Sequence, residues 1–170
     1  MGYLFLVVGP SGSGKDTLID YVTGKLPVSK VKRFVTRPPN AFEDFTSVSV
    51  SEFDSMVFFL KWGSYDKQYG IGSDILDGLK SGKHFIINVS RDVISEAKSK
   101  WRDTFVIALS VPKDVLVKRA LERGRDSPEE VAKRLSRDFV VSADFTVDSS
   151  NPDASVAGEK IVSFIKSIIK

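Results

Sequence analysis

The segment that most constrains the fold is Gly9–Lys15, which reads G-P-S-G-S-G-K and matches the pattern G-x-x-x-x-G-K. It follows the apolar run Tyr3–Val8 and precedes a helical segment, Lys15–Thr23, which is the context that this motif requires. Glycines let backbone N–H groups converge on phosphate oxygens, and the helix N-terminus adds a favourable dipole. The segment therefore predicts a loop that binds the phosphates of a nucleotide. The alternative is a glycine-rich turn with a chance lysine.

The residues after the loop depart from the usual pattern. Lys15 is expected to reach the transferring phosphate as a point charge. The hydroxyl residue that usually follows the lysine is replaced by Asp16, and Thr17 comes next. A carboxylate suits Mg²⁺, which prefers hard oxygen ligands, so Asp16 is a candidate metal ligand, either directly or through water. Otherwise Asp16 only favours the start of the helix, as acidic side chains do. The expected nucleotide contacts are Gly9, Pro10, Ser11, Gly12, Ser13, Gly14, Lys15, Asp16 and Thr17.

Short apolar runs alternate with helical patterns along the chain. The runs are mostly uninterrupted and rich in β-branched and aromatic residues, as in strands buried on both faces of a parallel sheet. The expected strands are Tyr3–Val8, Val31–Val35, Phe85–Val89, Phe105–Leu109 and Phe145–Val147. The expected helices are Lys15–Thr23, Arg91–Lys98, Pro112–Arg123, Pro128–Val141 and Ser155–Ile169. This alternation predicts an α/β fold of the P-loop nucleoside-triphosphate hydrolase type, a parallel sheet flanked by helices.

Length and charge narrow the class of protein. A chain of 170 residues suits one domain over residues 1–170, with 38–72 as an acceptor-binding insertion and 118–137 as a lid. The net charge of +3 does not by itself imply nucleic acid, and the absence of cysteine excludes thiolate metal sites. No apolar run approaches the roughly 20 residues of a membrane span. We expect a cytoplasmic protein, monomer or homodimer, that binds neither membrane nor nucleic acid.

Arginines concentrate between residues 118 and 137, on both sides of a turn that joins two predicted helices. In a phosphoryl-transfer enzyme such a helical hairpin brings guanidinium groups onto the transferring phosphate and excludes water. We expect Arg123, Arg125 and Arg134 to act in this way, with Arg119 as a further candidate. The alternative is a solvated charged face, because acidic residues are interleaved.

These motifs resemble the guanylate kinase superfamily. Gly9–Lys15 is similar to its phosphate loop, Thr36-Arg37-Pro38 with Glu43 to its acceptor-phosphate segment, and Tyr69-Gly70 to its Y-G element. Arg123-Gly124 through Arg134-Leu135 is similar to its lid. The resemblance spans nearly the whole chain and implies a kinase that uses ATP and Mg²⁺.

Within that superfamily the chain more closely resembles the ribose 1,5-bisphosphate phosphokinase family. The shared features are G-P-S-G-S-G-K-D ending at Asp16, Arg33–Pro38, Tyr69–Gly72 and Asn88–Arg91. The reaction implied is ATP plus ribose 1,5-bisphosphate giving ADP and 5-phosphoribosyl 1-diphosphate. The pathway implied is phosphonate use.

The base-reading carboxylates of guanylate kinases are missing. Their F-[IL]-E-[WY]-A segment is here Phe59–Gly63, with Lys61 in place of the acid, and their D-I-D segment is Ile87–Ser90. The N–H donors of guanine need acceptors, so the loss of these carboxylates disfavours GMP as the acceptor. A lysine suits an anionic acceptor better, although a solvent-facing lysine would explain Lys61 equally well.

A bisphosphorylated sugar needs two anion sites, and arginine forks bind phosphate oxygens in pairs. We expect Arg37 with Tyr69 at one site, and Arg33, Lys61 or Arg91 at the other. Glu43 is a candidate for orienting sugar hydroxyls. A surface charge is the alternative for Arg33, and a core packing role for Tyr69.

Three other functions remain open from the sequence. A nucleoside monophosphate kinase for GMP is the first, and a non-catalytic guanylate-kinase-like interaction module is the second. The intact Gly14-Lys15 pair and the arginine lid argue against that module. A nucleotide switch protein is the third, but no N-K-x-D base-reading motif occurs.

Overall fold

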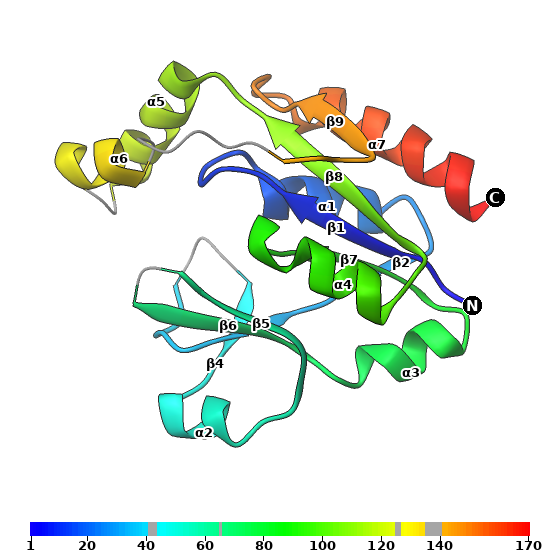
Figure 1. The fold of residues 1–170 in the computed structure, drawn as a ribbon. Helices are drawn as coiled ribbons and strands as arrows, with labels where there is room; N and C mark the ends of the chain where they lie inside the picture. The colour runs from blue at the N-terminus through cyan, green and yellow to red at the C-terminus, as the bar shows by residue number, and fades with distance from the viewer. Residues whose placement is uncertain (41–43, 65, 125–126, 135–140) are drawn as a thin grey trace. The chain divides into compact units, whose positions relative to one another are not determined.

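The computed structural model describes residues 1–40, 44–64, 66–124, 127–134 and 141–170 (Figure 1). They form two compact units that interleave along the chain. The first unit combines Met1–Leu6 with Pro27–Phe105, and the second combines Val7–Leu26 with Val106–Lys170.

The predicted parallel sheet is present, with the strand order β2-β7-β1-β8-β9. β2 is parallel to β7, and β8 is parallel to β9. All five residues of β1 are buried, which matches a strand covered on both faces. The strands are β1 (Leu4–Val8), β2 (Val28–Lys30), β7 (His84–Asn88), β8 (Thr104–Ser110) and β9 (Phe145–Asp148). The α/β fold class is therefore confirmed.

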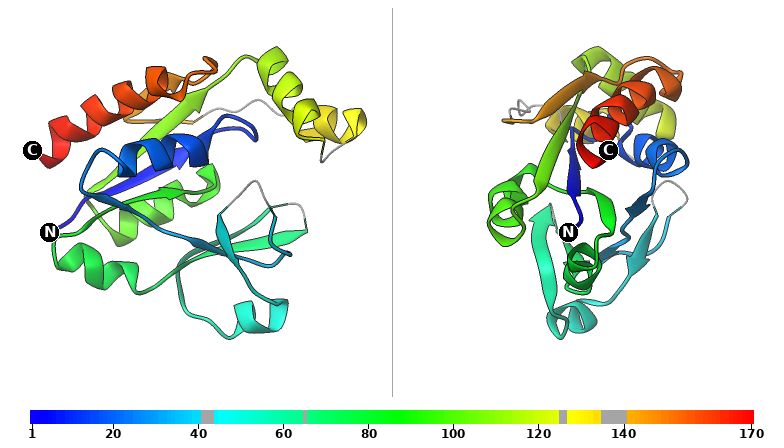
Figure 2. Two further views of the ribbon diagram at one scale, coloured as in Figure 1. Left: turned by 180° about the vertical axis from the view of Figure 1, so that it is seen from behind. Right: turned by 90° about the vertical axis from the view of Figure 1, so that its right-hand side faces the viewer.

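In the second unit, α1 (Lys15–Thr23) and α7 (Ala154–Ile169) lie side by side (Figure 2). Their contact is close, since a Cβ on Gly158 would lie 2.4 Å from a ring carbon of Tyr21. The Tyr21 hydroxyl donates a 2.8 Å hydrogen bond to Glu159 at the edge of this contact. Packing at Gly158 thus fixes the helix that follows the predicted phosphate loop.

A second, four-stranded sheet was not predicted. Its strand order is β4-β3-β6-β5, with β3 parallel to β4 and antiparallel to β6. Its strands are β3 (Arg33–Val35), β4 (Phe45–Ser47), β5 (Phe58–Ser64) and β6 (Lys67–Gly72). The run Val31–Val35, expected in the parallel sheet, belongs here instead. Val28–Lys30 supplies the missing strand, because it pairs with β7 from Val28 opposite His84.

The remaining helices are short. α2 (Val50–Asp54) begins with a complete capping box between Ser49 and Glu52, which the sequence analysis missed. The others are α3 (Ile75–Lys80), the 3₁₀ turn η1 (Arg91–Val93), α4 (Ile94–Lys100), α5 (Lys113–Arg123) and α6 (Pro128–Arg134). The predicted helix Pro128–Val141 is seen as far as Arg134, and residues 135–140 lie outside the described part. None of the described helices is long and apolar enough to cross a membrane.

The segment before β1 is held by hydrogen bonds within the first unit. The Tyr3 backbone N–H donates to His84 Nδ1 at 2.9 Å, and the two rings stack 5.4 Å apart. This bond requires a lone pair on Nδ1. Burial, followed by the positive charge of the chain's N-terminus, lowers the pKa of His84 below its ordinary value of 6.5.

Protonation of His84 should therefore destabilise the fold. The pKa of His84 is lower in the folded protein than in the unfolded chain, so the unfolded chain binds the proton more readily. The stability that unprotonated His84 contributes is therefore lost as the pH falls below about 6.5. In His84→Asn, Oδ1 replaces the acceptor without titrating. We expect the variant to lose less unfolding free energy than the wild type between about pH 7.5 and pH 5.5, measured by urea denaturation. Equal losses in the two proteins would contradict this role for His84.

Candidate active site

The predicted phosphate loop connects the end of β1 to the start of α1 (Figure 1). Gly12 and Gly14 have φ angles of 84° and 92°, a left-handed conformation that side chains with a Cβ rarely adopt. Gly14 is the N-cap of α1, and its carbonyl accepts the Leu18 N–H at 3.0 Å. The strand–loop–helix arrangement that the motif requires is therefore present.

The interior of the loop is tightly packed around Ser13, which is fully buried. The Ser13 N–H donates to the Pro10 carbonyl at 3.1 Å, and the Ser13 carbonyl accepts a 2.6 Å hydrogen bond from the Ser149 hydroxyl. The Ser13 hydroxyl oxygen has no hydrogen-bond partner among the described residues. A buried polar atom of this kind is usually satisfied by a ligand or by water, so the loop fits an anion.

Lys15 bends back over the loop that precedes it. Its Nζ donates to the carbonyls of Gly9 at 2.7 Å and Pro10 at 3.1 Å. An ammonium held there by neutral carbonyls can exchange them for phosphate oxygens, which bind a cation more strongly.

Asp16 stands in the first turn of α1, half-buried, and Thr17 is exposed. Within the described ranges, no group of three or more His, Cys, Asp or Glu side chains could hold a metal ion. A single carboxylate is nevertheless sufficient for Mg²⁺ that arrives with a nucleotide, because Mg²⁺ commonly combines one or two carboxylates with substrate phosphates. Asp16 fits that pattern.

Two arginines of α5 lie against the phosphate loop. A Cβ built on Gly12 would be 3.1 Å from Nη2 of Arg123, so that guanidinium lies beside the loop. Arg119 binds the Gly12 carbonyl directly, at 3.0 Å. Of the other predicted lid residues, Arg125 lies outside the described residues. Arg134 ends α6, and its side chain is not described.

The first unit contains most of the predicted acceptor residues. Arg33 is buried, and its guanidinium lies 5.2 Å from the centre of the Tyr69 ring. Trp62 pairs with Tyr69 across β5 and β6, and their rings are nearly parallel with centroids 5.6 Å apart. The stack contributes to accommodating this charged side chain, since aromatic faces attract guanidinium groups.

Of the other candidates, Lys61 lies on a different face of the sheet from this stack. Lys61 is exposed and pairs with Gly70, so it projects from the opposite face of the sheet to its neighbour Trp62. It does not share a face with Arg33 and Tyr69. The guanidinium of Arg37 lies 4.7 Å from the centre of the Phe45 ring, and Arg91 opens η1. Glu43 lies outside the described residues.

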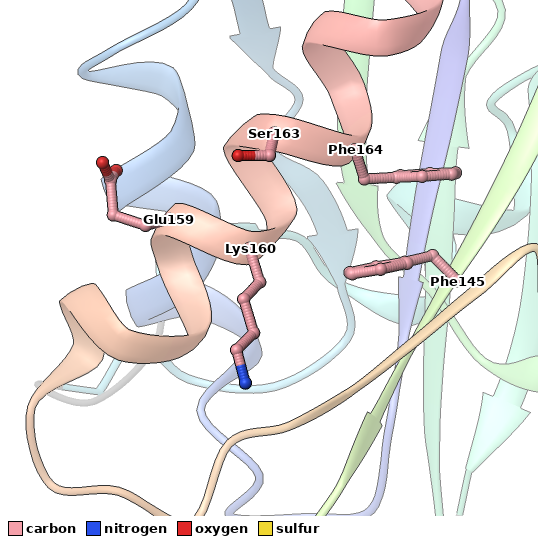
Figure 3. Close-up of a pocket in the computed structure, with 5 residues that line it drawn as sticks. All are labelled: Phe145, Glu159, Lys160, Ser163 and Phe164. Carbon is pink, nitrogen blue, oxygen red and sulfur yellow. The ribbon is translucent and has the colours of Figure 1, made fainter.

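A surface hollow also occurs in the second unit. It is lined by the side chains drawn in Figure 3, which are Phe145, Glu159, Lys160, Ser163 and Phe164. The rings of Phe145 and Phe164 stack with centroids 4.7 Å apart, joining β9 to α7. No residue of the predicted site lines the hollow, so we interpret it as a by-product of helix packing.

Comparison with solved structures identifies the fold. A guanylate kinase from Anaplasma phagocytophilum superposes with a TM-score of 0.69, covering 98% of this chain and 85% of the other at 15% identity. An unliganded sugar kinase from Janibacter sp. HTCC2649 gives 0.62, covering 99% and 97%, also at 15% identity. At this identity the likeness supports the fold alone.

Comparison with curated proteins gives nearer relatives. Ribose 1,5-bisphosphate phosphokinase PhnN from Acidiphilium cryptum is 35% identical over 162 residues, covering 92% of this chain and 89% of the relative. The protein of the same name from Thiobacillus denitrificans is 32% identical, covering 96% and 93%. A bifunctional ribose 1,5-bisphosphokinase-thymidine phosphorylase from Azorhizobium caulinodans is 36% identical over 145 residues, 21% of its length. No family model matches the chain.

The fold and the loop with its lysine and arginines define a P-loop kinase of guanylate kinase architecture. The curated relatives, which are more than 30% identical over most of both chains, then identify the family within this class. The chain belongs to the ribose 1,5-bisphosphate phosphokinase family.

Gly9→Ala should disable the loop. Its Cβ would lie 2.6 Å from the Ser13 hydroxyl and 3.1 Å from Cβ of Leu109, so the buried serine would have to move. We expect nucleotide affinity to fall by at least about tenfold, a loss comparable to one charge-assisted hydrogen bond. The measurement is isothermal titration calorimetry with ATP.

Gly24→Ala is the matched control, since Gly24 has φ −74° and its nearest contact would be an ordinary 3.4 Å. It should bind ATP as the wild type does. Equal affinity in Gly9→Ala would show that the close approach of Gly9 to Ser13 is not needed.

Proposed function

We propose that this protein transfers the terminal phosphoryl group of ATP to ribose 1,5-bisphosphate, giving ADP and 5-phosphoribosyl 1-diphosphate. The observation that carries the proposal is the similarity to ribose 1,5-bisphosphate phosphokinases over nearly the full length of both chains. The phosphate loop supports it, because Lys15 and the glycines are arranged to hold a triphosphate.

In this proposal the loop and α5 stabilise the charge that develops on the transferring group. Phosphoryl transfer depends mainly on positioning and electrostatic stabilisation, which cationic side chains supply. Lys15 would bind the terminal phosphate, and Arg123, beside Gly12, would contact its equatorial oxygens. Arg125 and Arg134 remain candidates for the same role. Bound Mg²⁺ would neutralise phosphate charge, with Asp16 as its protein ligand.

The acceptor would bind through the arginines of the first unit. We propose Arg37 with Tyr69 for one phosphate and Arg33, stacked on Tyr69, for the other. Lys61 and Arg91 are further candidates, although Lys61 projects from the other face of its sheet. Glu43 is retained as a candidate for the sugar hydroxyls.

GMP phosphorylation is the main alternative, and the fold alone allows it, because a guanylate kinase is among the structural neighbours. The residues do not favour it. An ammonium has only donors, so Lys61 cannot accept from the guanine N–H groups. A non-catalytic interaction module is disfavoured by the intact loop with Lys15 in place.

Asp16→Asn tests the metal role. We expect the Mg²⁺ concentration for half-maximal activity to rise several-fold, with a smaller change in the KM for ATP, because a neutral amide is a weaker ligand for Mg²⁺. Asp20→Asn, an exposed carboxylate on the same helix, is the control. A Mg²⁺ titration identical to that of the wild type would reduce Asp16 to a helix-start residue.

The acceptor is tested by a coupled ADP-release assay across GMP, AMP, dUMP, ribose 5-phosphate and ribose 1,5-bisphosphate. We expect kcat/KM for ribose 1,5-bisphosphate to exceed that for GMP, since discrimination built on missing polar partners reaches roughly 10⁴-fold. Both acceptors are measured at one ATP and one Mg²⁺ concentration. If GMP is the equal or better acceptor, the chain is a guanylate kinase with a rebuilt base pocket.

A further inference from the structure

Arg119 of α5 donates hydrogen bonds to three backbone carbonyls. Its Nη1 donates to the Gly12 carbonyl at 3.0 Å. Its Nη2 donates to the carbonyls of Ser149 at 2.8 Å and Ser150 at 3.1 Å. One guanidinium therefore joins three segments: helix α5, the phosphate loop and the turn that follows β9. With these donors engaged by backbone carbonyls, Arg119 is poorly suited to gripping a substrate phosphate.

A second hydrogen bond ties the same turn to the loop. The Ser149 hydroxyl, in a buried residue, donates to the Ser13 carbonyl at 2.6 Å. The carbonyls of two successive loop residues, Gly12 and Ser13, are thus held from outside the loop. Arg119 also binds this turn, so the hydrogen bonds from Arg119 and from Ser149 form one connected network.

Holding these carbonyls fixes the direction of the N–H groups next to them. In a planar trans peptide the carbonyl of one residue and the N–H of the next point in opposite directions. The peptide between Gly12 and Ser13 is fixed at both ends, by Arg119 on the carbonyl and by Pro10 on the N–H. By the same geometry, the hydrogen bond from the Ser149 hydroxyl to the Ser13 carbonyl directs the Gly14 N–H to the opposite side of that peptide. Converging N–H groups are what such a loop offers a phosphate.

The charge of Arg119 is also balanced locally. Asp148, at the end of β9, accepts the Ser150 N–H at 2.7 Å. Hydrogen bonding with the Ser150 side chain and then with its N–H, with smaller contributions from the positive charges of Lys160 and Arg119, lowers the pKa of Asp148 below its usual range. The carboxylate therefore stays ionised near the guanidinium at neutral pH.

We propose that Arg119 is a positioning residue that sets the geometry of the phosphate loop. Arg119 also precedes Arg123 by one helical turn, so the same anchor fixes where Arg123 lies against Gly12. The inference rests on the proposed use of ATP at this loop and does not depend on the identity of the acceptor.

Arg119→Lys, Arg119→Ala and the control Lys118→Ala test the proposal. Lys118 is the exposed neighbour on α5. ATP affinity is measured by calorimetry without acceptor, alongside the KM for ribose 1,5-bisphosphate and the melting temperature. We expect ATP affinity to fall by at least about tenfold in Arg119→Ala, and by less in Arg119→Lys, which reaches fewer carbonyls. The KM for the acceptor should stay within about twofold of the wild type, and Lys118→Ala should match the wild type throughout.

Ser149→Ala provides a second variant that removes only one hydroxyl, in case Arg119→Ala fails to fold. It should weaken ATP binding less than Arg119→Ala does. Combined with Arg119→Lys, its effect should be non-additive, as for residues of one network.

The proposal is overturned if Arg119→Lys and Ser149→Ala lower the melting temperature yet bind ATP within about twofold of the wild type. A wild type that binds ATP but does not phosphorylate ribose 1,5-bisphosphate would refute the proposed acceptor and leave this test intact. A wild type that binds no ATP would overturn both the proposed function and the role of Arg119.

Discussion

The left-handed backbone at Gly12 and Gly14 is the constraint on which the site depends. β1 is buried along its whole length, so the chain leaves the sheet at Val8 and must enter α1 within a few residues. Only glycine makes such a turn without strain, and a backbone without side chains lets a phosphate approach closely. Ser13, between the two glycines, then becomes the buried centre of the loop, and the contacts of Gly9, Ser149 and Arg119 gather around its peptide planes.

The loop could be predicted from sequence because its requirements are local. The spacing of Gly9, Gly14 and Lys15 after a buried strand specifies both the turn and the helix start. The Ser127–Glu130 spacing is another local pattern, and the Ser127 hydroxyl accepts the Glu130 N–H at 3.2 Å. Family membership likewise followed from short motifs, and similarity over most of both chains confirms it.

The second sheet could not be predicted, because strand pairing is non-local. Val31–Val35 reads as a buried strand, but its charged neighbours do not reveal which sheet it joins, and Val28–Lys30 is too short to stand out. The register of β5 against β6 also decides which face Trp62 shares with Tyr69, and a bulge between Phe58 and Leu60 shifts that register. The place of Lys61 follows from this pairing. Arg119 looked like one more lid arginine, since no sequence pattern shows that a guanidinium will bind backbone carbonyls.

The fold does not choose the acceptor, because guanylate kinases and a sugar kinase share it. The buried side chain of Arg33 is more informative. Aromatic faces attract guanidinium groups, so the rings beside Arg33 help to hold its fork in one orientation. Arg33 lies in β3 at 8% exposure, with Tyr69 and then Trp62 layered beside its guanidinium. In the proposed reaction this fork would take the second phosphate of the sugar, because an arginine fork recognises phosphate through paired hydrogen bonds. GMP carries one phosphate, so a second arginine fork held for phosphate suits the doubly phosphorylated sugar better.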